Sequence, residues 1–108
     1  MIPQLAPREL AAWRVDPTRE PPLVVDVREP WETGICRIEG SRCVPLAQLP
    51  GAAAELPRER DIVLVCHHGQ RSMYAGVWLR NAGFGRVHNL RGGIAAWASD
   101  VEPGMARY

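Results

Sequence analysis

The segment from Ile62 to Asn81 constrains the fold of this chain more than any other. Residues 62–65 are all apolar and three of them are β-branched, which predicts a short buried strand. The strand ends at Cys66, a polar loop containing Gly69 follows, and residues 73–81 are typical of a helix. A cysteine is therefore expected at the junction between the end of a strand and the beginning of a helix.

This position predicts a reactive thiol. The first backbone N–H groups of a helix have no partners within it, and their partial positive charge favours thiolate over thiol. The alternative is a buried cysteine that acts as a small apolar residue. The polar residues after Cys66 argue against burial in an apolar core; they are His67, His68, Gln70, Arg71 and Ser72. We therefore expect Cys66 to be a nucleophile.

The rest of the chain alternates between strand and helix patterns. We expect helices at 7–13 and 94–99, a helical turn at 31–33, short helical pieces within 46–56, and strands at 23–27, 42–44 and 87–90. This alternation predicts an α/β fold with a doubly wound, mostly parallel sheet of about five strands and helices on both faces. Sites in such sheets lie at the carboxyl ends of strands, where Cys66 falls by this independent argument.

Composition narrows the function classes. The 108 residues fit one domain, 1–108, and 46% hydrophobic with 23% charged residues is ordinary for a soluble protein. A net charge of +1 gives no case for nucleic acid or an anionic membrane as partner. Three cysteines without a C-x-x-C spacing argue against a disulfide framework or a zinc site. We expect no metal, no cofactor and no signal peptide, and a cytoplasmic location.

Five separated motifs, in the expected order, resemble the rhodanese-like family, specifically its single-domain bacterial members. They are Asp26-Val27-Arg28-Glu29, Ile38-Glu39-Gly40-Ser41 with Val44-Pro45-Leu46, Cys66-His67-His68-Gly69-Gln70-Arg71-Ser72, Asn81-Ala82-Gly83-Phe84 and Leu90-Arg91-Gly92-Gly93-Ile94-Ala95-Ala96-Trp97. The resemblance covers about residues 23–97. One departure is Cys36-Arg37, where family members commonly carry Gly-His, and it leaves the packing of this turn open.

The resemblance implies a sulfurtransferase that moves a sulfane sulfur from a donor such as thiosulfate to a thiophilic acceptor. The Cys66 thiolate would attack the outer sulfur of the donor, expel sulfite and carry a persulfide. An acceptor, cyanide in an assay or a thiol in a cell, would then remove that sulfur. Two such half-reactions predict ping-pong kinetics. The expected partners are therefore a small sulfur-donor anion and a thiol or cyanide acceptor. Whether a protein also accepts the sulfur is not decided by the sequence.

The loop residues His67, His68, Gly69, Gln70, Arg71 and Ser72 are the expected substrate-binding residues. Their successive N–H groups can form a nest around the sulfur, and Gly69 lets the backbone curl. We expect Arg71 to bind the donor anion, the alternative being an ion pair with a carboxylate such as Asp26. Ser72 is expected to cap the helix. His67 and His68 either lie at the mouth of the pocket or are ordinary surface residues, and the sequence does not decide between the two.

Asp26 and Arg28 follow the strand beside the expected site and are assigned to loop support. The resemblance suggests that Asp26 bonds toward the loop or its arginine, whereas the alternative is a strand-end carboxylate that caps the next turn. Cys36 and Cys43 are interpreted as packing residues in preference to resolving thiols for an oxidised Cys66.

Two other function classes are alternatives for this loop. Cysteine phosphatases use a Cys-x5-Arg loop, and the Cys-x4-Arg loop from Cys66 to Arg71 is one residue shorter, which leaves less room for a tetrahedral phosphate. A partner-dependent sulfur carrier or redox-sensing module also fits the loop. Its distinguishing property is slow turnover of small donors despite a detectable persulfide.

Overall fold

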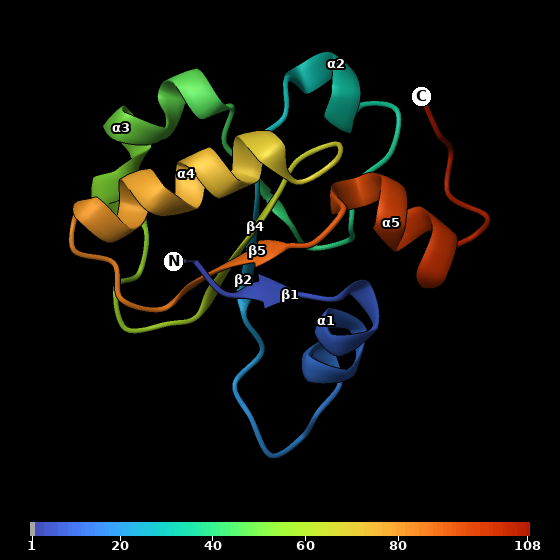
Figure 1. The fold of residues 1–108 in the computed structure, drawn as a ribbon, viewed down its shortest axis with the longest axis horizontal. Coiled ribbons are helices and arrows are strands. Elements are labelled where there is room, and N and C mark those ends of the chain that lie inside the picture. Colours follow the sequence, from blue (N-terminus) through green and yellow to red (C-terminus); the bar gives the residue numbers. More distant parts are fainter. Residues whose placement is uncertain (1) are drawn as a thin grey trace.

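The computed structural model describes residues 2–108 and contains a five-stranded sheet. The strand order is β1-β5-β4-β2-β3, and every neighbouring pair is parallel (Figure 1). The strands are β1 (Gln4–Leu5), β2 (Leu23–Asp26), β3 (Arg42–Cys43), β4 (Ile62–Val65) and β5 (Val87–Leu90). The predicted α/β architecture is confirmed.

Helices cover both faces of the sheet. The α-helices are α1 (Pro7–Arg14), α2 (Pro30–Thr33), α3 (Leu49–Ala52), α4 (Gln70–Asn81) and α5 (Gly93–Asp100), with 3₁₀ turns η1 (Leu46–Gln48) and η2 (Ala53–Glu55) beside α3. Residues of α3 and α4 pack in one apolar cluster, and residues of α1 and α5 pack in another. The sheet therefore separates two cores.

Strand β4 shows why this sequence needs cover on both faces. Successive side chains of a strand point to opposite faces. Ile62 and Leu64 belong to the cluster under α3 and α4, whereas Val63 and Val65 belong to the cluster under α1 and α5. A strand that is apolar at every position is stable in water when both of its faces are covered.

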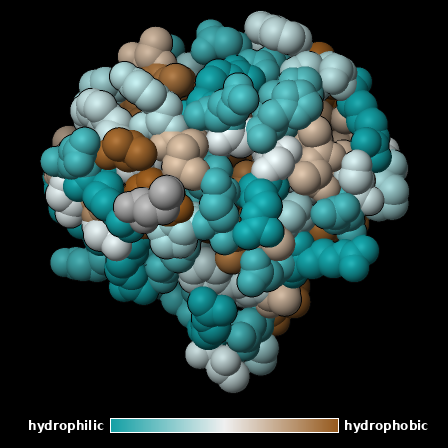
Figure 2. Space-filling model, in the orientation of Figure 1, coloured by the Kyte–Doolittle hydropathy of each residue, from teal (hydrophilic) through white to brown (hydrophobic). Residues whose placement is uncertain are grey.

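Short elements and element ends differ from the predictions. Strand β1 was not predicted, because two residues show no periodicity; it is defined by its pairing with β5. Helix α4 begins at Gln70, three residues before the predicted start. The surface in Figure 2 is largely hydrophilic, with apolar side chains in small separate patches. Within residues 2–108, no helix has both the length and the apolar character needed to cross a membrane.

The loop after β4 rests against the beginning of α5. The N–H of Ile94 donates to the carbonyl oxygen of Cys66 (2.8 Å), and that of Ala95 donates to the carbonyl of His67 (3.1 Å). Gly93 makes this approach possible, because its φ is +62° and a Cβ there would overlap both carbonyl oxygens. The free N–H groups of α5 thus position the cysteine loop.

We predict that Gly93→Ala lowers the free energy of unfolding by about 2–4 kcal/mol, because it adds left-handed backbone strain to a steric overlap. Urea denaturation measures the change. Gly51→Ala is the matched control, since a Cβ at Gly51 meets no atom within 4 Å, and we expect it to be neutral or stabilising by up to about 1 kcal/mol. Equal unfolding midpoints for the two variants would contradict the proposed role of Gly93.

Candidate active site

Cys66 lies immediately after β4, at the carboxyl end of the sheet. Its Sγ accepts a hydrogen bond from the Gly69 N–H at 3.0 Å and lies 3.3 Å from the Ser72 hydroxyl. Gly69 has a φ of +102°, a conformation that favours glycine, and this turn brings its N–H toward the sulfur. The loop therefore folds back on the sulfur and supplies polar donors to it.

Cys66 is nevertheless only 1% exposed, and it packs with the apolar cluster under α4. The expectation that its polar flank would keep this cysteine out of the core is wrong. His68 and Gln70 are exposed and Arg71 bonds Glu32, whereas Ser72 is buried beside the sulfur. The loop and its surroundings cover Sγ. A donor that reaches Sγ must therefore displace part of this cover.

Hydrogen bonds of two buried side chains, Ser72 and Asn89, fix the position of the loop. Ser72 is fully buried, and its hydroxyl bonds the Asn89 side-chain oxygen as well as lying near the sulfur. The Asn89 amide donates to the Gly69 carbonyl oxygen at 3.1 Å and to Gln4 Oε1 at 2.9 Å. The predicted capping role of Ser72 is wrong, because Gly69 is the N-cap and Ser72 lies inside the helix. No pattern in the sequence predicts that Asn89 contributes to the site.

Arg71 forms a bidentate ion pair with Glu32 of α2. The two nitrogen–oxygen distances are 2.7 and 2.8 Å; the Arg71 side chain is 37% exposed and that of Glu32 is 4% exposed. The hydrogen bonds from Arg71 are the main cause that lowers the pKa of Glu32 to about 2. Those bonds also raise the pKa of Arg71, to which the charge of Cys66 contributes less.

The carboxylate that pairs with Arg71 is therefore Glu32. Asp26 instead accepts hydrogen bonds from the backbone N–H of Arg28 (3.1 Å) and from its guanidinium, and the two side chains are at most 1% exposed. Burial opposes the charge on Arg28, but the bonds to Asp26 and Tyr108 outweigh it and raise its pKa. The suggestion that Asp26 bonds the loop or its arginine is wrong. Arg28 reaches α2 through the Glu32 carbonyl oxygen (3.4 Å).

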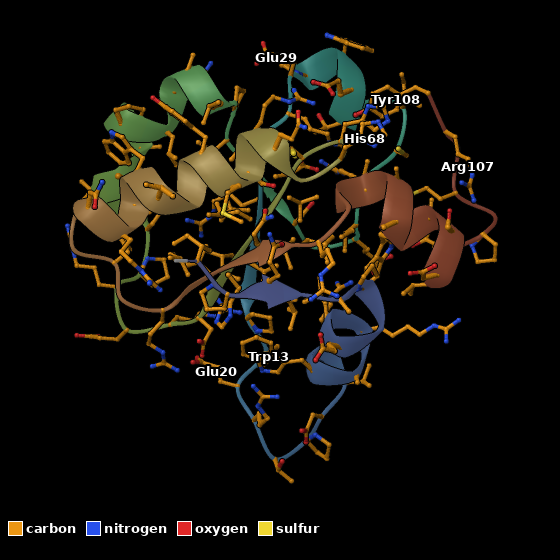
Figure 3. All side chains as sticks on the ribbon, viewed as in Figure 1. Trp13, Glu20, Glu29, His68, Arg107 and Tyr108 are labelled. Carbon is orange, nitrogen blue, oxygen red and sulfur yellow. The ribbon has the colours of Figure 1, made fainter. Side chains whose placement is uncertain are left out.

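Tyr108, near the other end of the chain, bonds the carboxylate of the same ion pair. Figure 3 shows its side chain beside α2 and close to His68. Its hydroxyl donates to Glu32 Oε2 at 2.7 Å and accepts from Arg28 Nη1 at 3.1 Å. Its ring stacks on His67, with the ring centroids 4.0 Å apart, and His67 stacks on His68 at 3.9 Å. Burial is the largest cause that raises the pKa of Tyr108 and lowers that of His67.

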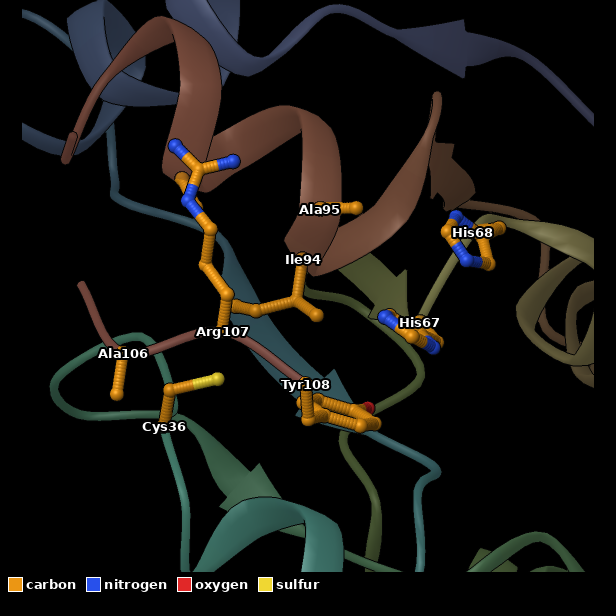
Figure 4. A pocket seen from close by; sticks show the side chains of 9 residues that line it. Cys36, His67, His68, Ile94, Ala95, Ala106, Arg107 and Tyr108 are labelled. Atoms are coloured by element: carbon orange, nitrogen blue, oxygen red, sulfur yellow. The ribbon is translucent and has the colours of Figure 1, made fainter.

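A pocket of about 130 Å³ lies beside the loop (Figure 4). His67 and His68 line one part of it, and α5, the half-buried Cys36 and the C-terminal segment 106–108 line the rest. Both histidines therefore face a cavity, and Cys66 is not among the residues that line it. Of the remaining predicted residues, Gln70 is exposed at the start of α4, and Cys43 is exposed on β3 instead of packed.

Comparison with known proteins identifies the family of this chain. The rhodanese-like domain family model matches residues 7–100. The chain belongs to the rhodanese-like domain family. A sulfurtransferase of Allochromatium vinosum is 43% identical over 84 residues, covering 78% of each chain. The crystal structure of a rhodanese-related protein from Thermoplasma volcanium superposes with a TM-score of 0.82 at 27% identity, covering 94% of this chain and 95% of the other.

A longer relative contains the same domain. The probable adenylyltransferase/sulfurtransferase MoeZ of Mycobacterium tuberculosis is 39% identical over 106 residues, which cover 96% of this chain and 26% of MoeZ. The chain therefore spans about a quarter of the length of that rhodanese-like relative. The resemblance found in the sequence motifs is confirmed as family membership.

The Glu32–Arg71 pair predicts a specific acid sensitivity. In the folded protein the pKa of Glu32 is about 2 instead of its ordinary 4.5, so the folded state resists protonating this group. Its stabilisation, up to about 3 kcal/mol, is complete above about pH 4.5 and is lost as the pH falls toward 2. We therefore expect the stability difference between wild type and Glu32→Gln to stay constant from pH 7 to about pH 5 and to shrink from there to pH 3.

Denaturant unfolding at several pH values tests this, with Glu55→Gln as control because Glu55 is exposed on η2. We expect the control to follow wild type at each pH. A Glu32→Gln difference that does not change between pH 7 and pH 3 would show that the ion pair does not carry the stabilisation.

Proposed function

We propose that this rhodanese-like domain is a sulfurtransferase that moves a sulfane sulfur from a donor such as thiosulfate to a thiophilic acceptor through a persulfide on Cys66. One observation carries the proposal. The Cys66 sulfur lies at the carboxyl end of β4 and accepts the N–H of Gly69 within a loop that folds around it. Such donors stabilise negative charge on sulfur, both in the thiolate and in the terminal atom of a persulfide.

The chemistry requires two displacements at sulfur. In the first, the Cys66 thiolate attacks the outer sulfur of thiosulfate, the new sulfur–sulfur bond forms, and the old one breaks with its electron pair leaving on sulfite. In the second, cyanide or a thiolate attacks the outer sulfur of the persulfide. The Cys66 thiolate then leaves and is ready for another cycle. In covalent catalysis of this kind the donor product leaves before the acceptor reacts.

Arg71 supplies the positive charge in this proposal. Its guanidinium is partly exposed, and its planar donors match the oxygens of a sulfonate group. Glu32 already accepts from both terminal nitrogens, so a donor anion must share them. Arg28, by contrast, is fully buried against Asp26 and supports α2 from beneath.

A partner-dependent sulfur carrier is the second candidate, favoured by the near-complete burial of Cys66. A carrier opens its loop when its partner docks, whereas a free-standing enzyme opens for small donors unaided. Ping-pong turnover of thiosulfate and cyanide supports the enzyme. A persulfide that forms but turns over slowly supports the carrier. A cytoplasmic location and a sulfur-accepting protein partner stay predictions from the sequence.

We predict that wild type gains the mass of one sulfur atom after exposure to thiosulfate and that Cys66→Ser gains none. Serine removes the nucleophile and changes little volume, so the fold should be retained. Intact-mass spectrometry is the measurement, with the Cys36→Ser, Cys43→Ser double variant as control, which should load like wild type. Equal sulfur uptake by Cys66→Ser would place the chemistry on another residue.

We predict that Arg71→Ala raises the apparent KM for thiosulfate about tenfold and changes kcat little, because the guanidinium attracts the anion before bond breaking. Steady-state kinetics with cyanide as acceptor measure both constants. Arg60→Ala is the control; this arginine is half-buried and donates to the carbonyl oxygen of Pro21, at the opposite end of β4. A collapse of kcat at unchanged KM would refute the anchoring role.

A further inference from the structure

Tyr108 lies outside residues 7–100 that match the family, yet its side chain contacts the site at several points. Besides the bonds to Glu32 and Arg28, its ring stacks on His67 and meets the edge of Trp31, with ring centroids 5.6 Å apart. The segment that carries it is anchored by Met105, which is buried in the cluster under α1 and α5. Tyr108 is therefore held in place beside the cysteine loop.

The hydroxyl of Tyr108 shares one oxygen with Arg71. Glu32 Oε2 accepts from Tyr108 at 2.7 Å and from Arg71 Nη2 at 2.8 Å. Oε1 similarly accepts from Arg71 Nη1 and from the N–H of Glu29 at 3.0 Å. Each oxygen of this buried carboxylate thus has a second donor besides Arg71.

This arrangement decides how easily Arg71 can turn toward a donor anion. A buried carboxylate that loses a hydrogen-bond donor without replacement is strongly destabilised. With Tyr108 and Glu29 in place, both Glu32 oxygens keep a partner when Arg71 moves. Without the Tyr108 hydroxyl, Arg71 would be the one remaining donor to Oε2 among residues 2–108. Release of Arg71 would then cost more free energy.

We propose that Tyr108 is a positioning residue that sets the affinity for the anionic sulfur donor by holding Glu32 while Arg71 engages that donor. The proposal rests on the sulfurtransferase function proposed above. Arg28 does not replace Tyr108 in this role, because its guanidinium is bound to Asp26 and bonds the backbone oxygen of Glu32 in place of its carboxylate.

The first test compares thiosulfate kinetics of wild type, Tyr108→Phe and Tyr74→Phe. Tyr108→Phe keeps the ring on His67 and removes the hydrogen bonds of the hydroxyl to Glu32 and from Arg28. Because the bond to the Glu32 carboxylate is lost, we expect KM to rise about fivefold with kcat within about twofold. Tyr74 is 68% exposed on α4, and its variant should match wild type. An unchanged KM for Tyr108→Phe overturns the proposal.

The second test is a double-mutant cycle with Glu32→Gln, because a residue that acts through Glu32 loses its effect when the carboxylate is gone. We expect Tyr108→Phe to leave the thiosulfate KM unchanged in the Glu32→Gln background. Equal fold-changes in both backgrounds would mean that Tyr108 acts through the general fold, and would overturn the proposal.

A third measurement does not depend on the stability of these variants. The chain has two tyrosines, so 3-fluorotyrosine incorporated into the Tyr74→Phe protein labels Tyr108 alone. We expect its ¹⁹F resonance to shift during thiosulfate titration; a resonance that stays fixed while Cys66 becomes loaded overturns the proposal.

If wild type gains no sulfur at all, both the proposed function and this role of Tyr108 are wrong. Sulfur loading without the Tyr108 effects removes the role and leaves the function standing.

Discussion

The organisation of this site depends on the contact between the ends of two parallel strands. The chain leaving β4 and the chain leaving β5 lie side by side, and α5 donates its first N–H groups to the carbonyls of Cys66 and His67. Gly93 permits this contact at a conformation that other residues rarely adopt. The loop is therefore fixed by backbone groups from a neighbouring strand connection, and its own sequence is free to supply chemistry.

Local patterns were sufficient for the parts of the structure that local physics decides. The apolar run at β4, the glycine after it and the following helix place Cys66 at the carboxyl end of a parallel sheet. Side-chain contacts between segments that are distant in the sequence could not be predicted in the same way. Glu32 lies 39 residues from Arg71 and Tyr108 lies 76 residues from Glu32, and no spacing rule connects them. The sequence did contain an acidic residue in the turn after Arg28, but Asp26 was the nearer and more obvious partner.

The burial of Cys66 shows why polarity along a chain is a poor guide to exposure. His68 and Gln70 are exposed, yet the cysteine between β4 and these residues points inward. In a tight loop the side chains diverge while the backbone converges, so polar neighbours and a covered sulfur are compatible. The same geometry brings the Gly69 N–H to the sulfur, and such a donor would also stabilise the proposed persulfide.

The position of Tyr108 also has a practical consequence for handling the protein. Its ring lies against His67, so any peptide joined after residue 108 would emerge next to the cysteine loop. An affinity tag placed there would crowd the cavity between the loop and α5. A domain fused after residue 108 would, by the same geometry, begin beside the loop that covers the Cys66 sulfur.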